Sequence, residues 1–304
     1  MKLSQLRDVV AIVEFGSLRA AARNLDIAQP LLTRSVRALE RQLGTPLFER
    51  DARGMVLTAA GVRFHRRASV IIQEARRAQE ELAQLGGAGT GTVVAGLSIM
   101  PHMGLLPKAL PAYRRQFPNV RLQLIEGLFP ALENRLREGS IDFYMGASPQ
   151  FPSAPGLSMR RLFANQRAVF CRGGHALAQA TSLAELASAE WATPSIDYDT
   201  SADLGRLFAQ HALPPPVIAL QAGSALSVMV ALAQTDLIAA LPMQWGHFEP
   251  MSGRLVTIPI REVLRAPDIV LISRADLPLT PAAEHLVDLM LREAPQDADE
   301  PGRL

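Results

Sequence analysis

The chain has 304 residues, of which 48% are hydrophobic, and a formal net charge of +2, as is typical of a soluble globular protein with two or three domains. No apolar run approaches the roughly 18 residues of a membrane span, and charged residues stand where a signal peptide would be apolar. We therefore expect a cytoplasmic protein that does not enter the membrane.

The only cysteine, Cys171, excludes an intramolecular disulfide, a thiolate zinc site and a CxxC redox motif. Its strand-like surroundings favour a buried structural thiol. A sensing thiol that pairs between two molecules is the alternative.

Positive charge is concentrated in the first third of the chain. Residues 1–90 contain 14 Lys and Arg against 9 Asp and Glu, whereas the remainder contains 17 against 20. This asymmetry indicates a polyanionic partner for the N-terminal region, although a solvated helical face would give the same counts.

Three helices are predicted within residues 1–44. The first ends at Phe15-Gly16, and Ser17 is the expected N-cap of a second helix that runs to about Leu25. A short turn leads to a third helix, which begins at Pro30 and ends at Gly44. Its apolar residues form one stripe at helical spacing, which we expect to be buried: Leu32, Val36, Leu39 and Leu43.

The opposite face of the third helix can donate hydrogen bonds to phosphates and base edges, except at its proline. This face comprises Gln29, Pro30, Thr33, Arg34 and Arg37. Residues 47–50 and 55–58 predict a hairpin with Arg50 and Arg53 near its tip. Two short helices, a third helix of this kind and a wing are typical of a winged helix-turn-helix that enters the major groove of double-stranded DNA.

Residues 59–85 predict one long helix with Thr58 as its N-cap. Apolar residues repeat at alternating spacings of four and three, as in a coiled-coil seam: Phe64, Ala68, Ile71, Ala75, Ala78, Leu82 and Leu85. We expect this linker helix, residues 59–86, to pair with a second copy of the chain. Packing of the seam against its own domain is the alternative. Residues 87–91 are glycine-rich and predict a hinge.

From residue 92 onwards strands alternate with helices, which predicts a parallel sheet. The expected strands are 92–99, 120–127, 141–147, 167–172, 216–220, 236–242 and 269–274. The expected helices are 103–117, 131–139, 200–212, 225–235 and 280–294. Two similar blocks and a return strand predict two lobes, with lobe I at 92–162 plus 268–295 and lobe II at 163–267. Residues 296–304 are expected to be a disordered tail.

In open parallel sheets, ligands bind beyond the carboxyl ends of the strands, where helix N-termini attract anions. The residues at such positions are Ser98, Met100, Pro101, His102, Phe129, Ala147, Ser195 and Ser224. We hypothesise that Ser98 and backbone N–H groups hold the acidic group of a small organic effector between the lobes, with Met100 and Phe129 against its apolar body. The alternatives are ordinary core positions for Met100 and Phe129 and a surface position for His102.

Catalytic motifs are missing from the sequence. GxSxG, HExxH and GxxxxGK[ST] do not occur, and the six histidines lack metal-ligand spacing. We therefore expect neither an enzyme nor a metal or cofactor site. A secreted solute-binding protein would suit the last two thirds of the chain, but the predicted basic helix-turn-helix and the missing secretion signal argue against it.

Residues 16–61 resemble the winged helix-turn-helix of LysR-type transcriptional regulators. The family's spacing is kept by Ala21-Ala22, Gln29-Pro30, Leu39-Glu40, Leu43-Gly44, Leu47-Phe48, Arg50 and Leu57–Gly61. Ala28 stands where the family often has Ser or Thr, and Thr33 where it usually has Ser. Fragments of the later chain, in order, are similar to the effector-binding half of the same family: LLP at 105–107, FPNV at 117–120, Gly139 with Asp142, GGHALA at 173–178 and ALP at 240–242.

The resemblance implies an α/β protein with an N-terminal all-α winged helix-turn-helix domain (1–58) and a C-terminal two-lobed domain (92–295) built like a periplasmic binding protein. It further implies a regulator of transcription whose DNA binding or activation is modulated by a small organic effector. A homodimer through residues 59–86, assembled into a homotetramer, is the expected form, with operator DNA as partner and RNA polymerase as a further candidate partner.

Overall fold

The computed structural model describes residues 1–51, 54–86, 89–149, 155–194, 200–247, 253–275 and 277–295. By its internal contacts the chain divides into two compact units. The first comprises residues 1–88 with 134–141, and the second comprises 89–133 with 142–304.

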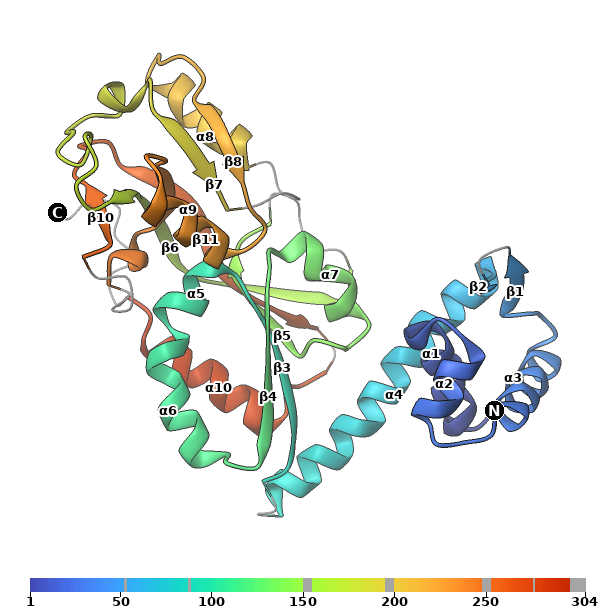
Figure 1. Ribbon diagram of the computed structural model, residues 1–304. Helices are drawn as coiled ribbons and strands as arrows, with labels where there is room; N and C mark the ends of the chain where they lie inside the picture. Colours follow the sequence, from blue (N-terminus) through green and yellow to red (C-terminus); the bar gives the residue numbers. More distant parts are fainter. Residues whose placement is uncertain are drawn as a thin grey trace. The chain divides into compact units, whose positions relative to one another are not determined.

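Three short helices and a β-hairpin begin the first unit (Figure 1). They are α1 (Leu3–Phe15), α2 (Leu18–Asn24), α3 (Gln29–Leu43), β1 (Phe48–Asp51) and β2 (Gly54–Leu57). The predicted N-cap of α2 is confirmed, because the Ser17 hydroxyl accepts a hydrogen bond from the Ala20 N–H at 3.2 Å. Gly44 ends α3 as predicted, with the left-handed φ of 68° that favours glycine there.

The buried stripe of α3 anchors the core of this unit. Leu32 and Val36 pack with Ala21, Ala22 and Ile12, where the small alanine side chains let the helices approach closely. Leu43 was expected in the stripe but is 38% exposed, because the helix ends at this residue.

Glu40 connects α3 to the hairpin. Its Oε1 accepts hydrogen bonds from the Leu47 N–H at 2.8 Å and the Phe48 N–H at 3.2 Å. A carboxylate that accepts two backbone N–H groups forms strong, charge-assisted bonds. The position of the wing relative to α3 is therefore held by a side chain of α3 itself.

Thr58 and Gly61 join the hairpin to α4 (Ala59–Leu85). The Thr58 hydroxyl donates to the Pro46 carbonyl at 2.8 Å and accepts from the Gly61 N–H at 2.9 Å, so Thr58 is the N-cap of α4 as predicted. The hairpin passes so close to α4 that a Cβ on residue 61 would lie 2.0 Å from the Leu47 carbonyl oxygen. Only glycine fits at this position.

The predicted apolar seam of α4 has two parts, which differ in how exposed they are. Its beginning packs within the first unit, where Ala68 is 1% exposed and Phe64 packs against the core around Leu39. Further along, Ile71, Leu82 and Leu85 are 44%, 72% and 70% exposed. The first part of the seam therefore packs against its own domain, which was the alternative prediction. Only the second part is exposed enough to contact a second copy of the chain.

The second unit is built on a mixed sheet with the strand order β10-β6-β11-β5-β3-β4, in which β9 also pairs with β6. The strands are β3 (Gly91–Leu97), β4 (Val120–Glu126), β5 (Phe143–Ala147), β6 (Leu157–Arg172), β9 (Ala239–Pro242), β10 (Leu255–Ile258) and β11 (Leu264–Arg274). A separate parallel pair consists of β7 (Glu190–Thr193) and β8 (Val217–Gln221).

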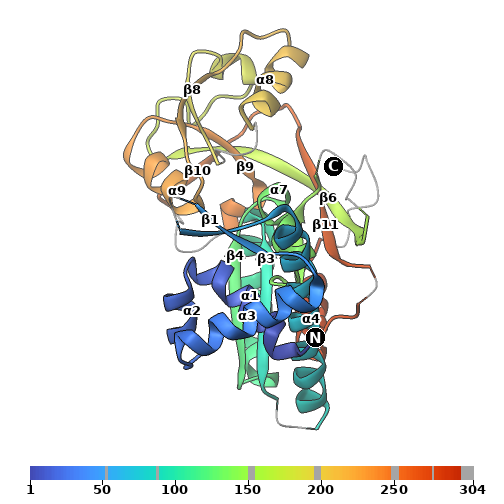
Figure 2. The ribbon, with the colours of Figure 1, turned by 90° about the vertical axis from the view of Figure 1, so that its right-hand side faces the viewer.

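The prediction of a wholly parallel sheet is wrong. β3 runs parallel to β4 and β5, but β11 is antiparallel to both β5 and β6. In Figures 1 and 2 the long strands β6 and β11 run side by side. They carry the chain from one group of elements to the other and back, so they run in opposite directions. The prediction placed only 167–172 of β6 in a strand and missed β7 and β10.

The helices of the second unit are α5 (Ile99–Gly104), α6 (Leu106–Gln116), α8 (Thr200–Gln210), α9 (Ala225–Gln234) and α10 (Pro281–Arg292), and two 3₁₀ turns are η1 (Leu183–Leu186) and η2 (Met243–His247). Helix α7 (Phe129–Arg137) begins in the residues of the second unit and ends in residues assigned to the first. The single helix predicted at 103–117 is wrong. Residues 99–116 form two helices that meet at Leu105, and Pro107 stands in the first turn of the second, where a proline is tolerated.

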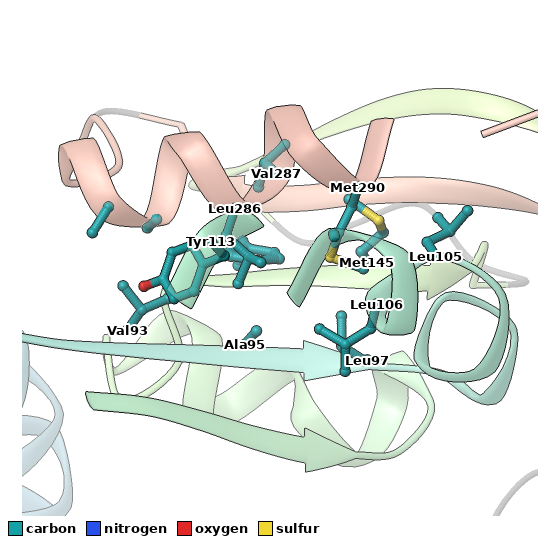
Figure 3. Packing of buried hydrophobic residues seen from close by; sticks show 14 of the residues in the cluster. Val93, Ala95, Leu97, Leu105, Leu106, Tyr113, Met145, Leu286, Val287 and Met290 are labelled. Carbon is teal, nitrogen blue, oxygen red and sulfur yellow. The ribbon is translucent and has the colours of Figure 1, made fainter. Parts of the chain in front are cut away.

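Separate hydrophobic cores define two lobes within this unit. In lobe I, Tyr113, Leu286 and Met290 pack on the face of β3 that carries Val93 and Leu97 (Figure 3). In lobe II, one core surrounds Trp191 and another surrounds Val228 and Trp245. The strands β6 and β11 contribute to the cores of both lobes, with Phe163 and Ile269 in the first and Val169 and Leu264 in the second.

Cys171 lies in a core of lobe II and is fully buried. Burial raises the pKa of its thiol, which disfavours the reactive thiolate. The folded chain therefore shields this cysteine, as expected of a structural thiol.

Candidate functional sites

The outer face of α3 is accessible along its N-terminal half. Gln29, Pro30, Arg34 and Arg37 are exposed and Thr33 is half-buried. On the opposite face, Leu32, Val36 and Leu39 are 0%, 4% and 0% exposed. The structure thus places all five predicted residues of α3 on the side away from the core.

Local hydrogen bonds distinguish these residues from one another. The Thr33 hydroxyl donates to the Gln29 carbonyl at 3.0 Å, and Arg34 Nε donates to the Pro30 carbonyl at 3.4 Å. Within the described ranges, Arg37 makes no hydrogen bond or ion pair. Its guanidinium is available for bidentate contacts with a phosphate or a guanine.

A buried polar contact that the sequence did not reveal fixes α3 on α1. The Ser35 hydroxyl donates to the carboxylate of Asp8, which is 5% exposed. A hydrogen bond to a buried carboxylate is stronger than one between neutral groups. It helps to hold the outer face of α3 in a fixed orientation.

The hairpin forms as predicted, and Arg50 lies in β1 opposite Met55. Arg53, the other predicted residue of the wing, lies outside the described residues.

The second unit contains a cavity of about 240 Å³. Both lobes contribute residues to its wall, and so do the connecting strands β6 and β11. Of the predicted effector residues, Ser98, Met100, Phe129 and Ala147 line this pocket. Pro101, His102 and Ser224 do not, and Ser195 lies outside the described residues. Positions 101 and 102 miss the pocket because successive residues of α5 are rotated by about 100° around the helix axis.

Ser98 holds two strand ends together at the pocket. It is 4% exposed, and its hydroxyl oxygen accepts from the Ala147 N–H at 3.2 Å. The Tyr144 hydroxyl donates to the Ala147 carbonyl at 3.1 Å, and burial raises the pKa of Tyr144, so the phenol stays protonated. Ser98 therefore has a structural role at this corner in addition to its place in the pocket wall.

Two buried polar atoms of the pocket wall lack partners. Asn165 and Thr193 are 7% and 3% exposed, and neither Asn165 Oδ1 nor Thr193 Oγ1 has a hydrogen-bond partner in the described part of the chain. Because burying an unpaired polar atom costs free energy, these two atoms are the positions in the wall at which a water molecule or a polar group of a ligand would be stabilised. Thr193 is the last residue of β7, so a sequence analysis that predicted this strand would also have identified Thr193. Asn165 lies within β6, and no local sequence pattern marks it as a pocket residue.

Arg167, also on β6, is a cation in the pocket wall. Its Nη2 lies 3.3 Å from Asp203 Oδ2, and Asp203 is also paired with Arg206. Because the single Asp203 carboxylate is shared between two guanidinium groups, the charge of Arg167 is only partly compensated, and this part of the pocket wall keeps a positive character.

The described residues contain no group of three or more His, Cys, Asp or Glu side chains arranged for a metal ion. In the same parts of the chain, no helix combines the length and apolarity required to cross a membrane.

The fold and these sites together define a class of protein: a DNA-binding regulator with a winged helix-turn-helix and a two-lobed α/β domain that encloses a ligand pocket. Residues 3–62 match the family model of the bacterial regulatory helix-turn-helix protein, lysR family, and residues 86–295 match that of the LysR substrate binding domain. The chain belongs to the LysR family of transcriptional regulators, which are not enzymes.

Among curated relatives, the SDS degradation transcriptional activation protein of a Pseudomonas species is 29% identical over 297 residues, covering 96% of each chain. The regulator GbpR of Azospirillum brasilense is 25% identical over 286 residues, covering 93% of this chain and 84% of its own. The crystal structure of full-length CbnR with its target DNA shares the fold, with a TM-score of 0.69 at 23% identity, covering 97% of this chain and all of CbnR.

Proposed function

We propose that this chain reads an operator with the outer face of α3 and the wing, and that a small organic acid in the pocket modulates this binding. The proposed DNA contacts are Gln29, Pro30, Thr33, Arg34, Arg37, Arg50 and Arg53. The main observation behind the proposal is that Arg37 is exposed and has no partner among the described residues, one turn from Thr33 and opposite a fully apolar buried stripe. Charged side chains held in this way can contact phosphates and base edges without any change in the fold.

The same proposal includes the division of the chain. We assign residues 1–58 to the DNA-binding domain, 59–86 to the linker helix, 87–91 to a hinge and 92–295 to the effector-binding domain. Lobe I comprises 92–162 with 268–295, and lobe II comprises 163–267.

We further propose a homodimer through the exposed part of α4, and a homotetramer built from two such dimers. Leu82 and Leu85 are among the most exposed large apolar side chains of the described chain. Burial of each in a dimer would contribute about 1.5–3 kcal/mol.

Replacing both Leu82 and Leu85 by Glu is expected to weaken the dimer at least ten-fold, because two apolar contacts per subunit are exchanged for charges. Sedimentation equilibrium measures the dissociation constant directly. Val263→Glu, at a comparably exposed apolar residue (62%) that is not part of α4, is the control and should dissociate like the wild type. An unchanged dissociation constant of the double variant would place the dimer contact elsewhere.

For the effector, we propose an organic acid whose acidic group accepts a hydrogen bond from the Thr193 hydroxyl and whose apolar body lies against Met100 and Phe129. The pocket wall is mainly apolar, with few polar groups, as is usual for small-molecule sites. The name of the Pseudomonas relative, which refers to SDS degradation, adds alkyl sulfates to the candidates.

A thermal-shift screen of aromatic acids, aliphatic acids and alkyl sulfates tests this proposal. A ligand at about 100 times its Kd stabilises the folded state by about 2.7 kcal/mol. We expect Thr193→Val to reduce the stabilisation by the best acid, and Thr257→Val, at an exposed threonine of β10, to leave it intact. Equal stabilisation by the acids and by their uncharged amides would contradict an acidic effector.

A further inference from the structure

One hydrogen bond crosses from lobe I to lobe II beside the pocket. Glu126 is the last residue of β4, and its Oε1 accepts from the Ala225 N–H at 3.0 Å. Ala225 is the first residue of α9. Glu126 and Gly223 both line the pocket, so this contact lies at the pocket wall.

The contact replaces a cap that α9 lacks. Its N-cap residue, Ser224, makes no side-chain hydrogen bond to the helix, and the first turn of α9 has no acidic residue. The first N–H groups of a helix have no partner within the helix and carry a partial positive charge, which a carboxylate stabilises. Glu126 supplies that carboxylate from the other lobe.

The surroundings of this helix end indicate a ligand as well. The Thr193 carbonyl accepts from the Ala222 N–H at 3.0 Å, which places Thr193 beside the N-terminal end of α9. Among the described residues, the buried hydroxyl of Thr193 has no hydrogen-bond partner, whereas Glu126 is an exposed residue. Both residues line the pocket, so a carboxylate and an unsatisfied buried hydroxyl belong to the same cavity wall.

We propose that Glu126 is a latch between the lobes whose carboxylate occupies the site of the effector's acidic group. The inference rests on the proposed effector pocket. An acidic ligand displaces Glu126, accepts from the Ala225 N–H and the Thr193 hydroxyl, and breaks the direct bond between the lobes. The latch lowers the apparent affinity for acids, because each acid must compete with a tethered carboxylate.

Rescue by a small carboxylate tests the latch in the full-length chain without DNA. Glu126→Ala is expected to lower the melting temperature of the second unit by about 2–4 °C, the effect of losing one helix cap. Sodium acetate should raise the melting temperature of Glu126→Ala back towards that of the wild type, and this effect should saturate with acetate concentration. Sodium chloride at the same ionic strength should not have this effect. The wild type, whose site is filled by Glu126, should show no such difference between the salts.

Two further variants make the result specific. Thr193→Val in the Glu126→Ala background should abolish the rescue, because it removes the second donor. Glu284→Ala removes an exposed carboxylate from the first turn of α10 and should show no acetate rescue. If Glu126→Ala does not fold, Glu126→Gln keeps the hydrogen bond without the charge and should gain a saturable acetate response that the wild type lacks; an acetate response equal to that of the wild type would overturn the latch.

Acetate that stabilises the wild type and Glu126→Ala equally, or stabilises neither, would overturn the latch. Such a failure leaves the proposed effector site standing, because the screen of larger acids on the wild type reports on the whole pocket. Conversely, the screen of larger acids could give no hits while acetate still rescues Glu126→Ala in a saturable way. That result would contradict the organic-acid effector but would support the anion site at α9.

Discussion

Gly61→Ala is expected to destabilise the first unit by about 3 kcal/mol or more, at the upper end of the cost of overpacking. The new Cβ would lie 2.0 Å from the Leu47 carbonyl oxygen. Because the Cβ is attached rigidly to the Cα of α4 and the carbonyl belongs to the backbone before the hairpin, neither can move aside without displacing the hairpin from α4. Differential scanning calorimetry should show the transition of the first unit at a lower temperature and that of the second unit unchanged.

Gly205→Ala is the matched control, since Gly205 also lies in a helix, α8, but a Cβ there would have no neighbour within 4 Å. It should leave stability unchanged or raise it by about 0.5–1 kcal/mol, because alanine favours the helix over glycine. If Gly61→Ala melted like this control, the close approach of the hairpin to α4 would be wrong.

Arg37→Ala is expected to weaken operator binding at least ten-fold without changing the melting temperature. Arg37 is exposed and unpaired within the described ranges, so its removal leaves no buried gap. If it contacts a phosphate, the slope of log K against log salt should fall by about one. A mobility-shift titration at several salt concentrations, with an operator selected from random duplexes, measures both quantities.

Arg115→Ala provides the comparison, because Arg115 is an exposed arginine of α6 in the second unit. It should bind the operator as the wild type does. If Arg115→Ala lost as much affinity for the operator as Arg37→Ala, then overall positive charge, and not the outer face of α3, would determine the affinity.

Local signals in the sequence were sufficient to predict the first unit. Ser17, Gly44 and Thr58 act at helix ends within a few residues of their own position, and the stripe of Leu32, Val36 and Leu39 follows from helical spacing. The seam of α4 shows the limit of this reasoning. The spacing predicted an apolar stripe, but it could not tell which half would be covered by the same chain.

Long-range pairing explains what the sequence did not predict in the second unit. β6 pairs with β11 across a separation of about a hundred residues, so no local pattern marks its first half as a strand. The place of Asn165 in the pocket was therefore not predicted, whereas Ser98 and Phe129 were identified because each lies at or shortly after the end of a predicted strand. Glu126 also ends such a strand, but its bond to α9 depends on how the two lobes meet.

In the proposed complex, the outer face of α3 lies against the bases of the operator. Because Cys171 is buried, a cysteine introduced on the surface can be labelled selectively with an iron chelate that cleaves nearby DNA. From Arg37→Cys we expect cleavage confined to a few base pairs within each operator half-site, and from Arg115→Cys none. Cleavage from Arg115→Cys alone, or none from Arg37→Cys in a complex that still binds the operator, would contradict the account.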